Sequence, residues 1–268
     1  MKQALFAITI ILFAVSSAFA AQNDIDVTRT QLWGNLIFKG KVTKSGLGIF
    51  TRYSSRYNVD FEKDKNDTVV DDETQGSWLN ELFIGPSYTT KLTPKLKLVT
   101  SPQYRVMGFY LDEKKKDSTP ADPEAYYEHT LHWPTTLAYN FGFLTVKYRL
   151  ILWNRFPYEY TQNGVEDETD NEFLTRHYAG VDIPLHKMLS FYLAEEVFIL
   201  HTAGDEGENT FWRNAVWTGF DIKPSKSFKF TLGYTNYYTF KEDSDVNEIT
   251  VNDHYIYTAI TYSTDFTK

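Results

Sequence analysis

The feature of this sequence that most constrains its fold is a repeated alternation of amphipathic segments with two kinds of connection. Within the segments, apolar and polar side chains alternate with a period of two, as in a β-strand with two unlike faces. The connections between the segments are alternately short and long. Short turns at one rim and long loops at the other are typical of a β-barrel that spans an outer membrane.

The short connections have the composition of tight turns, and the long ones are acidic. The short ones are Thr43-Lys44-Ser45-Gly46, Lys91 to Lys95, Asn140-Phe141-Gly142, Pro184 to Lys187 and Pro224-Ser225-Lys226. The long ones are Glu62 to Gly76, Asp112 to Glu124, Thr161 to Glu172, Ala203 to Asn209 and Lys241 to Asn252. We therefore predict short periplasmic turns and long acidic extracellular loops.

The predicted fold class is all-β, a single antiparallel up-and-down transmembrane barrel. The segments expected as strands are Thr30–Val42, Leu47–Asp60, Trp78–Thr89, Leu96–Leu111, Tyr126–Tyr139, Phe143–Tyr160, Phe173–Ile183, Leu189–His201, Phe211–Ile222, Phe228–Phe240 and Asp253–Phe266. A bacterial barrel made by one chain normally has an even number of strands. We therefore expect about twelve strands, or ten. An even number would require an extra strand from Asn23 to Arg29, one long segment that divides in two, or a differently oriented first hairpin.

Residues 1–20 predict a cleavable signal peptide, followed by one outer-membrane barrel domain at residues 21–268. Lys2 supplies a positive charge, Ala4 to Val15 form an apolar run, and Ala18-Phe19-Ala20 is a small-x-small cleavage site. The run of about twelve residues is short for a bilayer-spanning helix, so an uncleaved anchor is the weaker reading. The protein is therefore expected in the bacterial outer membrane.

Composition agrees with a barrel in a membrane. Aromatic residues make up 17% of the chain, and barrels place such residues in girdles at the two membrane interfaces. The mean hydropathy of −0.40 excludes a helical membrane protein, and the net charge of −8 argues against nucleic acid as a partner. A soluble β-sandwich or lipocalin-like barrel is the alternative, but its inward face would carry too many aromatic side chains.

Basic residues occupy one phase of the predicted strands. Every arginine after Arg29 falls on the face that we assign to the lumen. The predicted lumen-lining, solute-binding residues are Arg52, Arg56, Arg105, Lys147, Arg149, Arg155, Arg176, Arg213 and Lys229, with the acidic Glu81, Glu128, Asp182 and Glu196. An arginine that faces lipid at the membrane midplane would cost about 2–4 kcal/mol. This cost alone explains why the arginines face inward, whether or not they bind a solute. An excess of basic groups would also favour anionic solutes.

Five histidines lie near strand ends beside the long loops, and one lies in a short turn. They are His129, His132, His177, His201 and His254, with His186 in the turn. His129 and His132 are three residues apart and therefore point to opposite faces of a strand. No histidine spacing indicates a metal site, no serine–histidine pair indicates a hydrolase, and the acidic loops lack the spacing of a calcium-binding loop. We predict no metal, no cofactor and no enzymatic activity.

Several spaced motifs resemble a known family. They are Gln31 to Phe61 with Trp33, Arg52-Tyr53 and Arg56-Tyr57; Glu128-His129-Thr130-Leu131; Lys147-Tyr148-Arg149; and Asn154-Arg155-Phe156. They resemble a family of bacterial outer-membrane barrels described as a domain of unknown function, which implies a barrel and no established activity. More loosely, the chain is similar to twelve-stranded specific channels and to outer-membrane phospholipase, whose Asn-His-Gln-Ser-Asn-Gly motif it lacks.

The leading functional hypothesis is a narrow, porin-like channel for small, anionic solutes. A barrel with a plugged lumen that serves a structural or surface-display role is the first alternative, and an outer-leaflet lipid-modifying enzyme is the second. The expected partners are outer-membrane lipid, lipopolysaccharide and, during assembly, the barrel-insertion machinery. The sequence does not indicate an oligomeric state.

Overall fold

The computed structural model describes residues 27–58, 62–64, 69–71, 78–110, 125–156, 160–162, 165–167, 172–201, 210–240 and 249–267. The predicted signal peptide lies outside these residues. Within the described part of the chain, no helix is long and apolar enough to cross a membrane.

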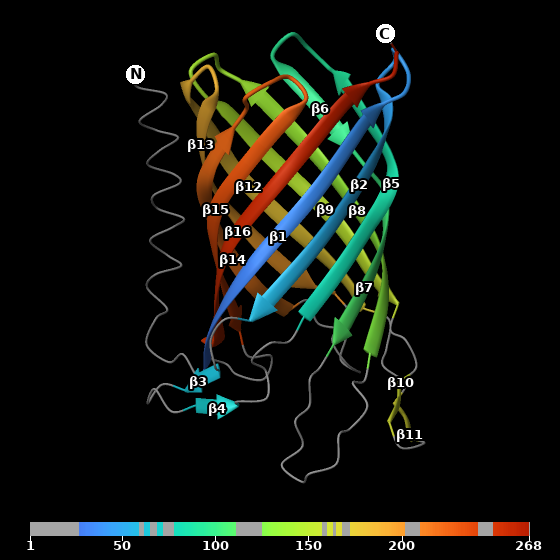
Figure 1. Ribbon diagram of the computed structural model, residues 1–268, viewed down its shortest axis with the longest axis vertical. Coiled ribbons are helices and arrows are strands. Elements are labelled where there is room, and N and C mark those ends of the chain that lie inside the picture. The colour runs from blue at the N-terminus through green and yellow to red at the C-terminus, as the bar shows by residue number, and fades with distance from the viewer. Residues whose placement is uncertain are drawn as a thin grey trace.

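The wall of the molecule is a closed barrel of 11 strands, with β6 and β7 counted as one (Figure 1). In order around the wall these are β1 (Val27–Lys41), β2 (Leu47–Asn58), β5 (Trp78–Lys91), β6 (Leu96–Thr100) with β7 (Gln103–Tyr110), β8 (Ala125–Asn140), β9 (Thr145–Phe156), β12 (Glu172–His186), β13 (Leu189–Leu200), β14 (Thr210–Ile222), β15 (Phe228–Phe240) and β16 (Ile249–Asp265). The predicted all-β barrel is confirmed, and each predicted strand segment corresponds to one strand of the wall.

The barrel closes through a parallel pair, β1 with β16, whereas all other neighbours in the wall are antiparallel. The pairing runs from Val27 opposite Val251 to Lys41 opposite Asp265. When an odd number of strands alternate in direction around a closed barrel, the first and last strands must run parallel. Because β16 begins at the long-loop rim, β1 begins there too. The extra strand considered at Asn23 to Arg29 is not separate, because Val27–Arg29 are the first residues of β1; residues 23–26 lie outside the described chain.

The predicted strand Leu96–Leu111 is interrupted but remains one strand of the wall. Both pieces pair with β5 in an unbroken register, Thr100 opposite Tyr88 and Tyr104 opposite Ile84. The interruption falls at Ser101-Pro102, because proline has no N–H to donate to a ladder. A divided segment therefore does not supply a twelfth strand.

The connections follow the predicted division, with two corrections. The expected turn from Pro184 to Lys187 is misplaced, since β12 continues to His186 through an irregularity after Pro184. Two of the predicted irregular loops contain small hairpins, and all of their strands lie outside the wall. They are β3 (Glu62–Asp64) with β4 (Val69–Asp71) and β10 (Tyr160–Gln162) with β11 (Val165–Asp167).

The outer face of the wall is apolar. Exposed aliphatic side chains cover it, including Leu36, Ile84, Leu131, Leu232 and Ile260. Towards the short-turn rim, aromatic side chains contact one another in groups. These groups are Phe38, Tyr262 and Phe228; Tyr139, Phe141 and Phe143; and Phe191 with Phe220. An exposed apolar surface that runs around a barrel is suited to lipid rather than water.

Two polar residues interrupt this apolar surface wherever neighbouring wall strands are joined by a long loop. In every case the two residues are diagonal neighbours across the strand pair, and they are hydrogen-bonded. The pairs and distances are Tyr53–Asn80 (2.7 Å), Tyr104–His129 (2.6 Å), Tyr148–His177 (2.8 Å), Glu195–Asn214 (3.0 Å) and Tyr234–His254 (2.5 Å). Three of the five histidines that the sequence places beside the long loops are thus hydrogen-bonded to outward tyrosines.

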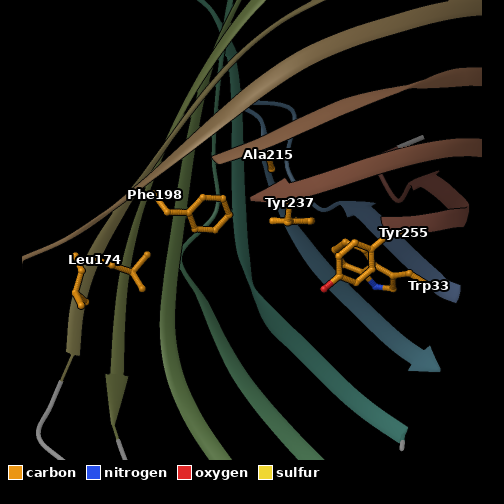
Figure 2. Packing of buried hydrophobic residues seen from close by; sticks show 7 residues of the cluster. Trp33, Leu174, Phe198, Ala215, Tyr237 and Tyr255 are labelled. Carbon is orange, nitrogen blue, oxygen red and sulfur yellow. The ribbon is translucent and has the colours of Figure 1, made fainter. Parts of the chain in front are cut away.

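The inside of the barrel contains a hydrophobic cluster. Its buried members come from six strands of the wall and are shown in Figure 2: Trp33, Leu174, Phe198, Leu200, Ala215, Tyr237 and Tyr255. Trp153, Trp217 and Tyr257 pack against them. The core therefore consists of inward aromatic and aliphatic side chains from β1 and from β12 to β16, rather than of a second layer of secondary structure.

Candidate functional site in the barrel lumen

The predicted lumen residues lie on strands with the inward phase. In β9, Lys147, Arg149 and Arg155 alternate with outward Tyr148 and Leu152, as predicted. All the other predicted residues follow this inward phase in their own strands. Glu128 lies in β8 opposite Met107, and its side chain is outside the described part. Whether any of them binds a solute stays a prediction.

The first ionic cluster surrounds Glu81 of β5, whose side chain is only 1% exposed. Arg105 of β7 forms a close ion pair with Glu81 and also donates from Nε at 3.1 Å. Arg56 of β2 approaches the same carboxylate from the other side, with Nη2 at 3.4 Å from Oε2. One buried carboxylate is thus shared between two arginines on neighbouring strands, which compensates its desolvation.

The second cluster repeats this arrangement around Glu196 of β13. Arg149 Nη2 lies 3.2 Å from Oε1, and Arg176 Nη2 lies 2.8 Å from Oε2. Glu196 has no exposed surface, whereas the Arg149 side chain is 32% exposed and that of Arg176 is 14% exposed. The carboxylate is therefore buried against the wall, while parts of the guanidinium-bearing side chains remain in contact with solvent.

Guanidinium groups of the lumen also lie over aromatic rings. The Cζ atom of Arg52 is 3.7 Å from the ring centroid of Phe83, that of Arg56 is 4.2 Å from Trp33, and that of Arg176 is 4.3 Å from Phe198. Such contacts orient arginine without neutralising its charge. For Arg52, the described residues provide no carboxylate within ion-pair distance.

Ion pairs and hydrogen bonds also hold the basic residues toward the two ends of the lumen. Towards the short turns, Lys147 pairs with Asp182, and Lys229 Nζ lies 3.1 Å from Asp221. Towards the long loops, Arg155 pairs with Glu172, and Arg213 donates from Nε to Thr239 at 2.9 Å. Lys147, Lys229 and Arg155 thus each have a carboxylate partner of their own, whereas in each of the two clusters one carboxylate is shared by two arginines.

Sequence reasoning missed several charged residues with the inward phase, including Lys39, Glu172, Asp221 and Asp253. Lys39, Asp221 and Asp253 lie within predicted strands and could have been found by continuing the alternation to the strand ends. Lys39 is separated from Trp33, and Asp221 from Arg213, by an even number of positions, so each pair faces the same side. Glu172 fell one residue outside the predicted strand. The missed residues supply partners, because Asp221 holds Lys229 and Glu172 holds Arg155.

No group of histidine, aspartate and glutamate side chains suited to a metal ion occurs among the described residues. His132 points inward, where its ring lies 5.2 Å from Phe83 and 6.0 Å from Trp153. The Nδ1 atoms of His129 and His177 are instead hydrogen-bonded to the hydroxyl groups of the outward-facing Tyr104 and Tyr148. The opposite orientation of His129 and His132 follows the strand alternation predicted for them.

A family model described as "Protein of unknown function (DUF2490)" matches residues 30–248, and the chain therefore belongs to this family. No curated protein matches the chain in sequence. Among solved structures, the outer-membrane expressed OmpT of Vibrio cholerae is 10% identical, with a TM-score of 0.38, over 76% of this chain and 59% of that chain. The translocator domain of autotransporter NalP from Neisseria meningitidis is 14% identical, with a TM-score of 0.39, over 73% of this chain and 70% of that chain.

Proposed function

We propose that this DUF2490 protein is an outer-membrane barrel that works as a narrow channel with a preference for small anions. The described wall leaves no free sheet edge, since β1 pairs with β16, and closure of this kind is what a β-structure requires in lipid. The outward aliphatic surface and the aromatic groups near the short turns support a membrane location.

The observation that carries the anion preference is the different burial of the acids and bases in the middle of the lumen. Glu81 and Glu196 are buried, whereas Arg56 is 22% exposed and Arg149 is 32% exposed although both side chains point into the barrel. In the middle of the lumen a solute therefore meets the guanidinium groups of Arg56 and Arg149 rather than the carboxylates of Glu81 and Glu196. Hydrogen-bond donors that carry positive charge stabilise anions and repel cations.

A structural barrel with a closed lumen is the second candidate, and the inner hydrophobic cluster favours it. Its rings extend from Phe198 through Tyr237 to Tyr255 and Trp33, and they fill part of the cross-section. The exposed surface that Arg56 and Arg149 keep inside the barrel favours the channel, because water reaches these side chains. The outer-leaflet enzyme stays a hypothesis that no contact among the described residues favours.

The test is the reversal potential of the purified barrel in a planar bilayer under a KCl gradient. We expect its sign to report chloride preference. Arg52→Gln should lower the chloride-to-potassium permeability ratio by about tenfold, because a unit charge about 6 Å from the path contributes about 0.7 kcal/mol in water, favourable for chloride and unfavourable for potassium. Arg52 suits this test because its removal breaks no ion pair between described residues.

Lys44→Gln is the matched control, since Lys44 lies in the turn between β1 and β2 and its loss changes the net charge equally. We expect this variant to keep the wild-type reversal potential. Potassium preference would disprove the proposal. A correctly inserted barrel without conductance would establish the closed, structural alternative instead.

A further inference from the structure

The inner wall is divided into two arcs of different chemistry. From β2 to β12 it carries five arginines in mid-lumen, among which the rings of Phe83, His132 and Trp153 also lie, with the clusters of Glu81 and Glu196 at its two ends. From β13 through β16 to β1 the mid-lumen residues are mainly aromatic, although Asp253 of β16 also has the inward phase. We call these the charged arc (Arg52, Arg56, Glu81, Arg105, Arg149, Arg176, with Glu196 of β13) and the aromatic arc (Phe198, Trp217, Tyr237, Tyr255, Tyr257, Trp33).

The two arcs meet at the same level of the barrel. Arg56 lies 4.2 Å from the Trp33 ring at one junction, and Arg176 lies 4.3 Å from the Phe198 ring at the other. Trp33 and Phe198 are joined through Trp217 and Tyr237, with ring centroids 5.7 to 5.9 Å apart. A solute that crosses this level contacts both arcs at once.

The charged arc contains a convergence of like charges. Arg52 of β2 lies 3.7 Å from the Phe83 ring, Arg176 of β12 lies 5.3 Å from the Trp153 ring, and the inward His132 contacts both rings at 5.2 and 6.0 Å. The two arginines thus line the same stretch of the lumen, although four other wall strands lie between them. The Nε atoms of Arg52 and Arg176 are buried and have no hydrogen-bond partner among the described residues. Guanidinium groups that approach each other across a lumen favour an anion between them, and their fork geometry suits a carboxylate.

The aromatic arc offers ring faces and N–H donors. Trp217 and Tyr257 are only partly buried, and their rings meet edge to face at 5.9 Å. In the part of the chain that the structure describes, nothing accepts a hydrogen bond from the indole Nε1 atoms of Trp33 and Trp217. Ring faces of this kind stack against a flat apolar body, and neither indole provides a negative charge that would repel an anion.

We propose that this level of the lumen is a binding site for a small aromatic carboxylate. Its carboxylate lies between Arg52 and Arg176, and its ring packs against Trp217 and Tyr257. The proposal rests on the lumen being open to solutes, as in the proposed channel. It goes further in requiring that the barrel distinguish between anions of equal charge by their apolar part.

The experiment is a calorimetric titration of the full-length barrel in detergent micelles, which needs no conductance. The probes are benzoate, acetate, which has the charge without the ring, and benzyl alcohol, which has the ring without the charge. We expect benzoate to bind at least about tenfold more tightly than either of the others, since a ring stack and a charge contact each contribute on this scale. Empty micelles give the background from partitioning.

Two variants separate the arcs. Trp217→Leu should bring benzoate affinity close to that of acetate, and Arg52→Gln should bring it close to that of benzyl alcohol. Tyr257→Leu is a second test of the aromatic arc in case Trp217→Leu does not fold, as judged by heat-modifiable gel mobility. Lys44→Gln, in the turn outside the lumen, should bind benzoate like the wild type.

Equal binding of benzoate and acetate by the wild type would overturn the proposal, as would benzoate binding that both aromatic-arc variants retain. These outcomes differ from a failure of the channel itself. A barrel that conducts chloride selectively but does not prefer benzoate keeps the proposed function and loses this inference. A barrel that prefers benzoate without conducting keeps a lumen site and loses the channel.

Discussion

The charged and aromatic arcs of the inner wall stabilise the same lumen by different means. In the charged arc, Glu81 and Glu196 are buried only because two arginines accompany each of them. In the aromatic arc, Trp33, Tyr237 and Tyr255 are buried against one another, with ring centroids 5.1 to 6.0 Å apart between Tyr255 and each of the other two. One arc depends on charge compensation and the other on packing.

This difference shows which changes each arc tolerates. A buried ion cluster is sensitive to the loss of one partner, because the remaining charge is left in a poorly solvated place. A ring cluster is sensitive to volume instead, since packed side chains leave little room for extra atoms. The substitutions below are ordered by the size of the expected loss of stability.

The largest effect is expected for Glu81→Gln. This change removes the carboxylate from Arg105, whose side chain is only 4% exposed, and the loss of one partner from a buried pair costs about 3–5 kcal/mol. Urea unfolding of the barrel in lipid vesicles, followed by tryptophan fluorescence, measures it. Glu195→Gln is the matched control, because it removes the same charge but its hydrogen-bond partner Asn214 is neutral. Equal losses in the two variants would contradict the role given to Arg105.

An intermediate effect is expected for Ala215→Leu in the hydrophobic cluster next to the aromatic arc. Ala215 has no exposed surface and lies in the cluster with Trp33 and Tyr237, so three extra carbon atoms overpack the site at a cost of about 1–3 kcal/mol. The same unfolding measurement applies. Val216→Leu, one residue further and facing outward, should stay within about 0.5 kcal/mol of the wild type. A neutral result at Ala215 would mean that the cluster has unfilled space.

The smallest effect is expected for Glu172→Gln at the long-loop end of the lumen. Glu172 is 38% exposed and its partner Arg155 is 30% exposed, and an ion pair that water reaches contributes about 0–1 kcal/mol. This variant sharpens the contrast with Glu81, because the charge removed is the same and only its burial differs. A loss as large as that of Glu81→Gln would show that burial does not govern these pairs.

Much of this architecture could be predicted from the alternation along the strands. Lys147, Arg149, Ile151 and Trp153 share a face of β9 because successive side chains of any strand point to opposite sides. The same rule separates His129 from His132 without any tertiary information. Pro102 also explains why the segment Leu96–Leu111 is interrupted between β6 and β7 although it forms one strand of the wall.

Other features depend on how the ends of the sheet meet. The sequence predicts eleven strand segments, and the usual even number of strands in bacterial barrels then leads to an expectation of ten or twelve. Local patterns do not reveal that β1 and β16 pair in parallel and close a ring of eleven. Partnerships among charges are equally non-local. Glu196 and Arg149 are 47 residues apart in the chain, and no spacing rule relates residues on strands that are two positions apart in the wall.

The sequence by itself determined which side chains face the lumen and which face outward, because the two-residue period is a local property of the backbone. Only the tertiary structure decided that the inner face divides into a charged and an aromatic arc, and which arginine meets which carboxylate. Those relations depend on strand order, register and closure, which bring together residues from both ends of the chain. The preference for anions, and for aromatic carboxylates among them, is proposed on these relations.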